Sequence, residues 1–483
     1  MPANLISVGL LLSSIGNRGI RAAIRWCQLR TNATPRRPFL PTALRSRGGS
    51  WGTVLQKEMI MVRAPERGPA GTVLHDTVYR SVFLILVVQG VMFGGQMPFM
   101  PLWAKDQLGA GSAMVGTISL VSSLVTTAFA LAYGFFTDRT RRRVRWIIIA
   151  YAIALPTRIA LAYVTSFVVG AALYSLIGMA MFVLYYAILG DWLQHRQSTQ
   201  RAEVMNIVRL GFTIGWLTGA FGAGWFVTHF GYDGMFIASA VLHAISMVLL
   251  VTGVRDAPLA ERDPGRDPVA TAHDATPLWV DLVRPAVAWY LLTSICTGAA
   301  SVARMTLLPL YLRDVVQADA DAIGVVFGIE PVYEIPVSLL AGAVVGRLGV
   351  ERLMVIGIGA GVVYFAAVAV TTSFVPFLVI EALYAVVVTA TFGFGLVHVQ
   401  NLMPRRGGMA IAAYNAAGTV GPLIAAPGLG WVADNVGWVP VYVTAATLMA
   451  IGLATMWMSD RANRHDRLLR SSQVNVGSLA VSA

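Results

Sequence analysis

From Arg80 onward the chain is a regular succession of apolar segments, each about 20 residues long and separated from the next by a short turn. A helix of about 20 apolar residues is long enough to cross the roughly 30 Å hydrocarbon core of a bilayer. The composition agrees, because only 12% of the residues are charged and 56% are hydrophobic, whereas a soluble domain carries about 25% charged residues. The sequence therefore predicts an all-α membrane protein with twelve transmembrane helices. The predicted spans are 81–103, 113–136, 146–164, 167–190, 204–228, 234–254, 286–310, 322–345, 352–371, 374–398, 408–432 and 437–458.

One long internal linker, residues 255–285, is charged and rich in proline, and it divides the spans into two sets of six. The sets resemble each other in detail. Gly134–Arg139 closes the second span and Gly342–Arg347 closes the eighth, and basic residues follow both. We therefore expect two six-helix pseudo-repeats. The predicted domains are an N-terminal extension (1–79), a first bundle (80–254), a cytoplasmic linker (255–285), a second bundle (286–458) and a cytoplasmic tail (459–483).

The N-terminal extension differs from the rest of the chain. It is rich in arginine and has no acidic residue before Glu58. This composition is typical of an organellar transit peptide. The alternative is an upstream start codon, with translation beginning at Met59 or Met61. Arginine greatly outnumbers lysine, which occurs only at Lys57 and Lys105, and this bias favours a GC-rich bacterial genome and the second interpretation. Under either one we expect residues 1–79 to be poorly ordered.

The basic residues between the spans predict the orientation. One set of alternate loops holds most of the arginines, whereas the other set holds only Lys105 and Arg313. Loops rich in Lys and Arg face the cytoplasm, so we expect both termini to be cytoplasmic and the chain to be a multi-pass protein of the cell membrane. This distribution explains the net charge of +12 without nucleic-acid binding. The arginines of the basic set are Arg139, Arg141, Arg142, Arg143, Arg145, Arg196, Arg201, Arg255, Arg262, Arg266, Arg284, Arg347, Arg352, Arg405, Arg406, Arg461, Arg464, Arg467 and Arg470.

Enzyme chemistry finds no support in the sequence. Cys27 and Cys296 are far apart, so they indicate neither a metal site nor a disulfide framework. The chain contains no HExxH, no phosphate-binding GxxxxGK[ST] and no GxSxG motif. We therefore expect no enzyme activity, no metal, no other cofactor and no ATP-driven pumping.

Two glutamates in the eighth span are the strongest functional signal. Glu330 and Glu334 are four residues apart, so they share one face of a helix. An ionisable residue near the bilayer centre costs roughly 3 kcal/mol and usually faces a bundle interior or a water-filled cavity. Depths estimated from the helical rise place Arg304 near Glu330, and we expect these two to form an ion pair. Glu334 lies deeper and is the better candidate for proton coupling. The alternative is a static ion-pair network.

Further polar residues interrupt the apolar spans. Arg158, Arg209 and Glu381 are candidates for ion pairs or for the pathway, although Glu381 is shallow enough to be structural and Arg209 could extend to the cytoplasmic surface. Other side chains could bind a solute by hydrogen bonding or stacking, although aromatic residues also fill cores. These substrate-pathway candidates are Gln89, Gln96, Trp216, Tyr185, Tyr186, Gln400 and Asn415.

The link between the second and third spans, Tyr133–Arg143, resembles the signature loop of the major facilitator superfamily. A degraded copy follows the eighth span. This sequence departs from the family pattern at Arg141, where glycine is usual, and at Gly346, where the second copy usually has aspartate. The resemblance implies the major facilitator fold, with the substrate site between two six-helix repeats. It also implies a gating-loop role for Gly134, Asp138, Arg139 and Arg142.

Later segments resemble one branch of that superfamily, the bacterial sugar efflux transporters. The matching residues are Glu334–Ile335–Pro336, Gln400–Pro404, and the fifth-span residues Val204–Met205, Arg209, Trp216 and Gly219. The resemblance implies an exporter of sugars or glycoside-like solutes. It would work by alternating access, with proton entry driving export. We expect the protein to be a monomer. A multidrug/proton antiporter for amphiphilic compounds is one alternative. A non-transporting membrane scaffold or receptor is another, which the charges within the spans disfavour.

Overall fold

A computed structural model describes residues 69–140, 142–177, 181–195, 201–257 and 278–481. Most of the N-terminal extension and most of the linker thus lie outside the described residues. The expectation of poor order is wrong for residues 69–79. Helix α4 (Pro69–His75) forms there, and the Asp76 side chain accepts hydrogen bonds from the backbone N–H groups of Val78 and Tyr79. Asp76 therefore caps α5 (Thr77–Gln96), as an aspartate just before an apolar helix commonly does.

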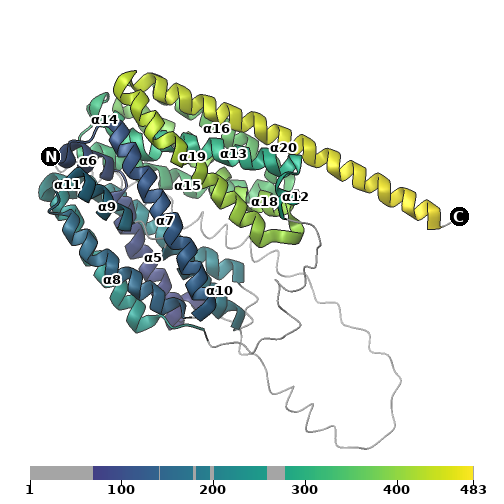
Figure 1. The fold of residues 1–483 in the computed structure, drawn as a ribbon, viewed down its shortest axis with the longest axis horizontal. Coiled ribbons are helices and arrows are strands. Elements are labelled where there is room, and N and C mark those ends of the chain that lie inside the picture. Colours follow the sequence, from purple (N-terminus) through teal and green to yellow (C-terminus); the bar gives the residue numbers. More distant parts are fainter. Residues whose placement is uncertain (1–68, 141, 178–180, 196–200, 258–277, 482–483) are drawn as a thin grey trace, which may run out of the picture. The chain divides into compact units, whose positions relative to one another are not determined.

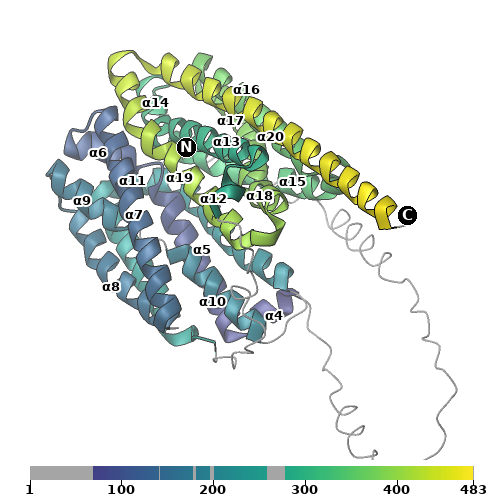
Figure 2. The ribbon, with the colours of Figure 1, turned by 45° about the vertical axis from the view of Figure 1, so that its right-hand side comes forward.

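The described part of the chain is helical and contains no strand. The remaining helices are α6 (Met100–Leu108), α7 (Ser112–Thr140), α8 (Arg143–Leu161), α9 (Phe167–Ile177), α10 (Met181–His195), α11 (Arg201–Gly253), α12 (Leu278–Leu282), α13 (Pro285–Val302), α14 (Leu308–Asp314), α15 (Ala320–Leu348), α16 (Val350–Val370), α17 (Phe374–Val388), α18 (Gly395–Leu402), α19 (Gly407–Asn435) and α20 (Trp438–Val481). Figure 1 and Figure 2 show most of these helices as long, tilted neighbours, whereas α12 and α14 are short.

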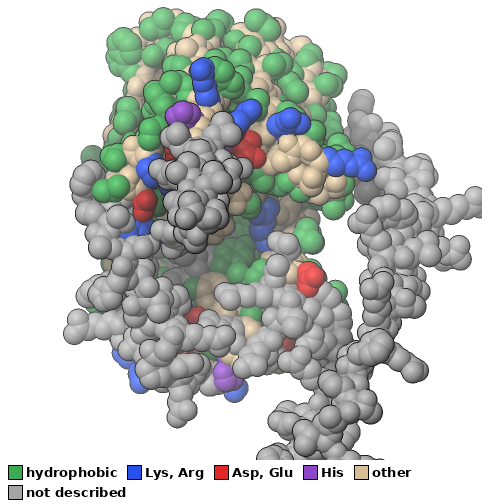
Figure 3. Space-filling view, turned by 90° about the vertical axis from the view of Figure 1, so that its right-hand side faces the viewer, with side chains coloured by type: hydrophobic (Ala, Val, Ile, Leu, Met, Phe, Trp, Pro, Cys, Tyr) green, Lys and Arg blue, Asp and Glu red, His purple; other side chains and the backbone are tan. Residues whose placement is uncertain are grey.

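The predicted fold class is confirmed. Ten helical stretches among the described residues are long and apolar enough to cross a membrane. One of them, Glu203–Gly253, contains two predicted spans, because α11 breaks at Gly231, where φ is 67° and ψ is −175°. The predicted span 167–190 corresponds to α9 and α10, which flank residues 178–180 outside the described part. In Figure 3 hydrophobic side chains cover most of the upper surface, and Lys and Arg side chains lie below them.

Glycines allow the helices of each set to approach closely. A Cβ atom at Gly215 of α11 would lie 2.0 Å from the Val87 carbonyl oxygen of α5. In the second set, a Cβ atom at Gly421 of α19 would lie 2.0 Å from the Ile295 carbonyl oxygen of α13. Both distances are too short for any other residue. The fifth span thus packs on the first in the same way that the eleventh packs on the seventh, as small residues permit in membranes.

Helices of the first set also contact helices of the second set. A Cβ atom at Gly116 of α7 would lie 2.0 Å from the Ala426 carbonyl oxygen of α19, and one at Gly224 of α11 would lie 2.3 Å from the Ala320 carbonyl oxygen of α15. These contacts lie close to the N-terminal ends of α7 and α15. The two sets therefore pack tightly at this end of the helices, which we call the closed end.

Candidate functional site

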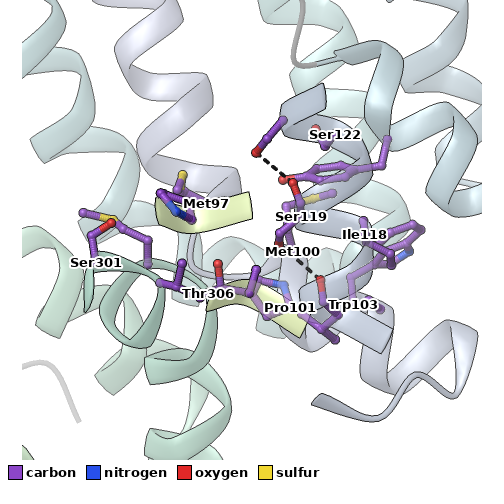
Figure 4. A pocket seen from close by; sticks show the side chains of 17 residues that line it. Met97, Met100, Pro101, Trp103, Ile118, Ser119, Ser122, Ser301 and Thr306 are labelled. Carbon is purple, nitrogen blue, oxygen red and sulfur yellow. Dashed lines mark hydrogen bonds between the residues drawn. The ribbon is translucent and has the colours of Figure 1, made fainter. Parts of the chain in front are cut away.

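A cavity of about 280 Å³ lies between helices of the two sets, near the closed end. Figure 4 shows Ser119, Ser122 and Ile118 of α7 on one side of it, with Ser301 and Thr306 of the seventh span opposite. Among the described residues, none that lines it carries a charge. The lining residues are Met97, Met100, Pro101, Trp103, Ala104, Val115, Ile118, Ser119, Ser122, Ser123, Tyr174, Ser301, Val302, Met305, Thr306, Pro422 and Ala426.

The polar groups of this cavity are mainly hydroxyls. Three of them donate to carbonyl groups of their own helices: Ser119 Oγ to Val115 (3.2 Å), Ser123 Oγ to Ser119 (2.8 Å) and Ser301 Oγ to Gly298 (2.6 Å). Their hydrogens are thereby occupied, while the oxygen lone pairs stay available as acceptors. The cavity can therefore accept hydrogen bonds from a neutral solute without presenting it with a charge.

None of the predicted substrate-pathway residues lines this cavity. The sequence did contain a signal for it. Ser119, Ser122 and Ser123 are three and four residues apart, which places them on one face of an otherwise apolar helix. Serine is small and only weakly polar, so this face did not stand out beside the glutamates and glutamines.

The closed end is held by two reciprocal ion pairs, which we call the clasp (Lys105, Asp106, Arg313 and Asp314). Lys105 Nζ of α6 lies 2.7 Å from Asp314 Oδ2 of α14. Arg313 of α14 pairs with Asp106 of α6, whose carboxylate also accepts a hydrogen bond of 2.8 Å from the Tyr232 hydroxyl. Each set of helices thus contributes one cation and one anion to the clasp.

Arg304 does not pair with Glu330, contrary to the prediction. Its guanidinium lies 2.8 Å from Glu381 Oε2, and the two side chains are 1% and 0% exposed. Tyr364 donates a hydrogen bond of 2.9 Å to the other Glu381 oxygen. The predicted depths assumed a regular α-helix, but Arg304 lies in a π-helical turn, Ala303–Leu307, which changes the direction of its side chain.

Glu330 and Glu334 have different surroundings. Glu330 is buried near Arg304, and its Oε1 has no hydrogen-bond partner within the described part of the chain. Glu334 is only partly buried and interacts electrostatically with Arg209 of α11. Because α15 and α11 belong to different sets, the charge of Glu334 acts across the boundary between the sets, although no ion pair between these two side chains is present in the described part of the chain. Arg209 is exposed and also interacts with Tyr186, which is partly buried.

Several predicted pathway residues lie together inside the first set of helices instead. Gln89 and Tyr185 both donate to the Tyr151 hydroxyl, at 2.7 Å and 2.5 Å. Arg158 Nη1 donates to Gln96 Oε1 at 2.8 Å and to Ser239 Oγ at 2.6 Å. The His243 ring stacks on Tyr151 with ring centres 4.1 Å apart.

The other predicted residues are scattered. Trp216 packs against Gly94 of α5, whereas Gln400 and Asn415 are exposed on α18 and α19. In the predicted gating loop, Gly134, Asp138 and Arg139 belong to the last turns of α7, but the surroundings of these three residues lie outside the described part. Arg142 is exposed and precedes α8.

Long apolar helices in two sets, with an uncharged cavity between them that is closed at one end, define a polytopic transporter of small solutes. Comparison with known proteins agrees. The family model described as "Major Facilitator Superfamily" matches residues 82–404 and 305–480, and the chain belongs to that family. It is accordingly a multi-pass membrane transporter and not an enzyme.

The resemblance to bacterial sugar efflux transporters is also confirmed. Sugar efflux transporter A of Escherichia coli is 24% identical over 382 residues, which are 78% of this chain and 94% of that protein. A putative sugar efflux transporter of Deinococcus radiodurans is 23% identical over 77% of this chain and 94% of its own length. A crystal structure of the nucleoside transporter NupG has the same fold, with a TM-score of 0.61 and 17% identity over 78% of this chain and 98% of that one.

Proposed function

We propose that this transporter exports sugars or glycoside-like solutes across the cell membrane by alternating access coupled to proton entry. The observation that carries the proposal is the uncharged, hydroxyl-lined cavity between the two sets of helices. The names of the similar sugar efflux transporters support the same substrate class. Small-molecule solute and protons are then the partners of a monomeric protein embedded in lipid.

The chemistry of the cavity suits a small, neutral, hydroxyl-rich molecule. Acceptor oxygens of Ser119, Ser123 and Ser301 can bind sugar hydroxyls, and Tyr174 adds an aromatic surface. Its volume of about 280 Å³ lies just below the range of about 300–1,000 Å³ that is usual for ligand pockets. A single sugar or a small glycoside fits this space better than a bulky amphiphile does.

Alternating access requires one end of the pathway to open while the other closes. The clasp and the glycine contacts close the end near α6 and α14. The distribution of arginines predicts that the termini are cytoplasmic, so the clasp faces outward. Opening of the clasp would then release the solute to the outside.

Proton coupling requires a carboxyl group whose charge alters the contact between the two sets. Glu334 meets this requirement, because it is partly buried and interacts with Arg209 of the other set. Protonation of Glu334 removes the attraction to Arg209, and deprotonation restores it. Glu330 is more fully buried than Glu334 and lies beside an arginine that is already paired, so we assign it a structural role.

The test is a flux assay with the purified full-length protein in proteoliposomes. A panel of labelled monosaccharides, disaccharides and glycosides is compared with a cationic amphiphile, with and without a proton gradient. We expect flux of at least one neutral sugar, accelerated by the gradient. Ser119→Leu, which fills the cavity, should abolish it, whereas Thr447→Leu on the exposed face of α20 should not. Flux of the amphiphile alone would support the multidrug antiporter, and no flux of any compound would support the scaffold.

A further inference from the structure

A second pocket, distinct from the cavity between the two sets, lies within the first set of helices. It is formed by α5 and both arms of α11 and has a volume of about 430 Å³. Thr218, Gly222 and Val241 at its rim are exposed, so the pocket opens on the outer surface of the bundle, where membrane lipid lies. Its walls are apolar, and Gln96 and Ser239 give it a polar region.

Those two polar residues are the hydrogen-bond partners of Arg158. Arg158 is 2% exposed, and its Nη1 donates to Gln96 Oε1 and Ser239 Oγ. Within the described part of the chain no carboxylate pairs with Arg158, and its Nε and the Gln96 Nε2 have no hydrogen-bond partner. A buried cation whose charge is not compensated is costly in the interior of a membrane protein.

The second set of helices shows how such a charge is normally balanced. When Lys105–Asp106 is aligned with Arg313–Asp314, Gln96 of the first span corresponds to Arg304 of the seventh. Glu381 supplies the counter-charge of Arg304 at 2.8 Å. The first set has a buried cation, Arg158, but none of the described residues of that set supplies a carboxylate to pair with it. The pocket next to Arg158 can receive that carboxylate from a ligand.

We propose that this pocket binds a long-chain fatty acid from the surrounding leaflet, with its carboxylate at Gln96 and Ser239, behind which Arg158 lies, and its chain along the apolar walls. The carboxylate supplies the missing charge from the pocket side of Gln96 and Ser239, the two side chains to which Arg158 Nη1 donates. At roughly 30 Å³ for each group of water size, a pocket of about 430 Å³ holds about 14 such groups, which is most of one acyl chain and too few for the two chains of a phospholipid. The site is independent of sugar export, because it lies on the lipid-facing side of one set.

The test is equilibrium binding of radiolabelled palmitate to the full-length protein in nanodiscs of neutral phosphatidylcholine. We expect saturable binding of one palmitate, with hexadecanol binding at least tenfold more weakly because it lacks the charge. Gly222→Phe should abolish binding by filling the pocket, since a Cβ atom there meets nothing within 4 Å. Gly359→Phe is the matched control, because Gly359 of α16 has equally open surroundings and should not affect binding.

Arg158→Gln should weaken palmitate binding at least tenfold while leaving hexadecanol binding unchanged. If this variant does not fold, the comparison of acid with alcohol on the unmodified protein still tests the charge. Equal affinity for palmitate and hexadecanol would overturn the proposal, and so would palmitate binding that survives Gly222→Phe. Displacement of palmitate by phosphatidylglycerol at equal concentration would assign the pocket to an anionic phospholipid and overturn the choice of a fatty acid.

Discussion

Asp434, near the end of α19, caps the N-terminus of α7 in the other set of helices. Its Oδ1 accepts a hydrogen bond of 2.9 Å from the Ser112 backbone N–H, and its Oδ2 accepts one of 2.8 Å from Ala113. A helix N-terminus has unpaired N–H groups and a partial positive charge, both of which a carboxylate satisfies. In this protein the cap therefore also joins the two sets at the closed end.

Asp434→Ala should shift the protein toward the state in which this end is open. Loss of an N-cap costs about 1 kcal/mol, which corresponds to a shift of about fivefold in the equilibrium. Spin labels at Tyr163 and Val436, in exposed loops of the two sets, report the change as a larger population of long distances. Asp319→Ala is the control, because Asp319 caps α15 within its own set and its removal should leave that population unchanged.

Charge reversal in the clasp should also open this end. Lys105→Asp places the new carboxylate beside that of Asp314, so we expect the protein to return more slowly to the closed state. The closed state should lose about 0.2–1 kcal/mol of stability relative to the open state, and added salt should reduce this loss. The double variant Lys105→Asp/Asp314→Lys should restore the wild-type equilibrium. Reversal of the Arg464–Asp460 pair, which lies within α20, should have no effect. If the double variant populated the closed state no more than Lys105→Asp does, the clasp would not be what holds this end closed.

Breaking the Arg304–Glu381 pair should destabilise the protein strongly. Arg304→Met leaves the Glu381 carboxylate buried without its cation, at a cost of about 3–5 kcal/mol. Arg304→Met/Glu381→Met removes both charges and should recover most of that loss. Thermal unfolding in detergent measures both variants. Equal destabilisation of the single and double variants would show that packing, not charge, accounts for the effect.

Glu334→Gln should uncouple transport from the proton gradient. The amide cannot ionise, so the attraction to Arg209 no longer changes with pH. We expect sugar flux to continue while its acceleration by a pH gradient disappears. Glu330→Gln should reduce stability and retain the acceleration. Flux assays in proteoliposomes at several pH gradients separate the two glutamates, and full coupling in Glu334→Gln would exclude this assignment.

The spans and the fold class were predictable because hydropathy is a local property. Each run of about 20 apolar residues needs only its own side chains to mark it as a membrane helix. The break at Gly231 lies between the predicted spans 204–228 and 234–254, because local hydropathy also marks where an apolar run ends. Order at residues 69–79 was missed, since it depends on the Asp76 cap and on burial of Val73 and Tyr79 against other helices.

The partners of buried polar residues were harder to predict. The π-helical turn at Ala303–Leu307 changes the direction of Arg304, and nothing in the local sequence marks this turn. Gln89 and Gln96 were expected in the pathway because they are polar, but polarity does not show which side of a helix faces the cavity. The serines of α7 do line the cavity, but they were not predicted, because serine is only weakly polar.

The order of charges in the clasp has a consequence for its origin. Lys105–Asp106 and Arg313–Asp314 occupy equivalent places, and each cation binds the anion of the other set. This reciprocity is the signature of an isologous interface, in which the same patch meets itself across a two-fold axis. A single six-helix ancestor with one basic–acidic dipeptide would therefore form both bridges on dimerising, and gene duplication would preserve them without any new substitution.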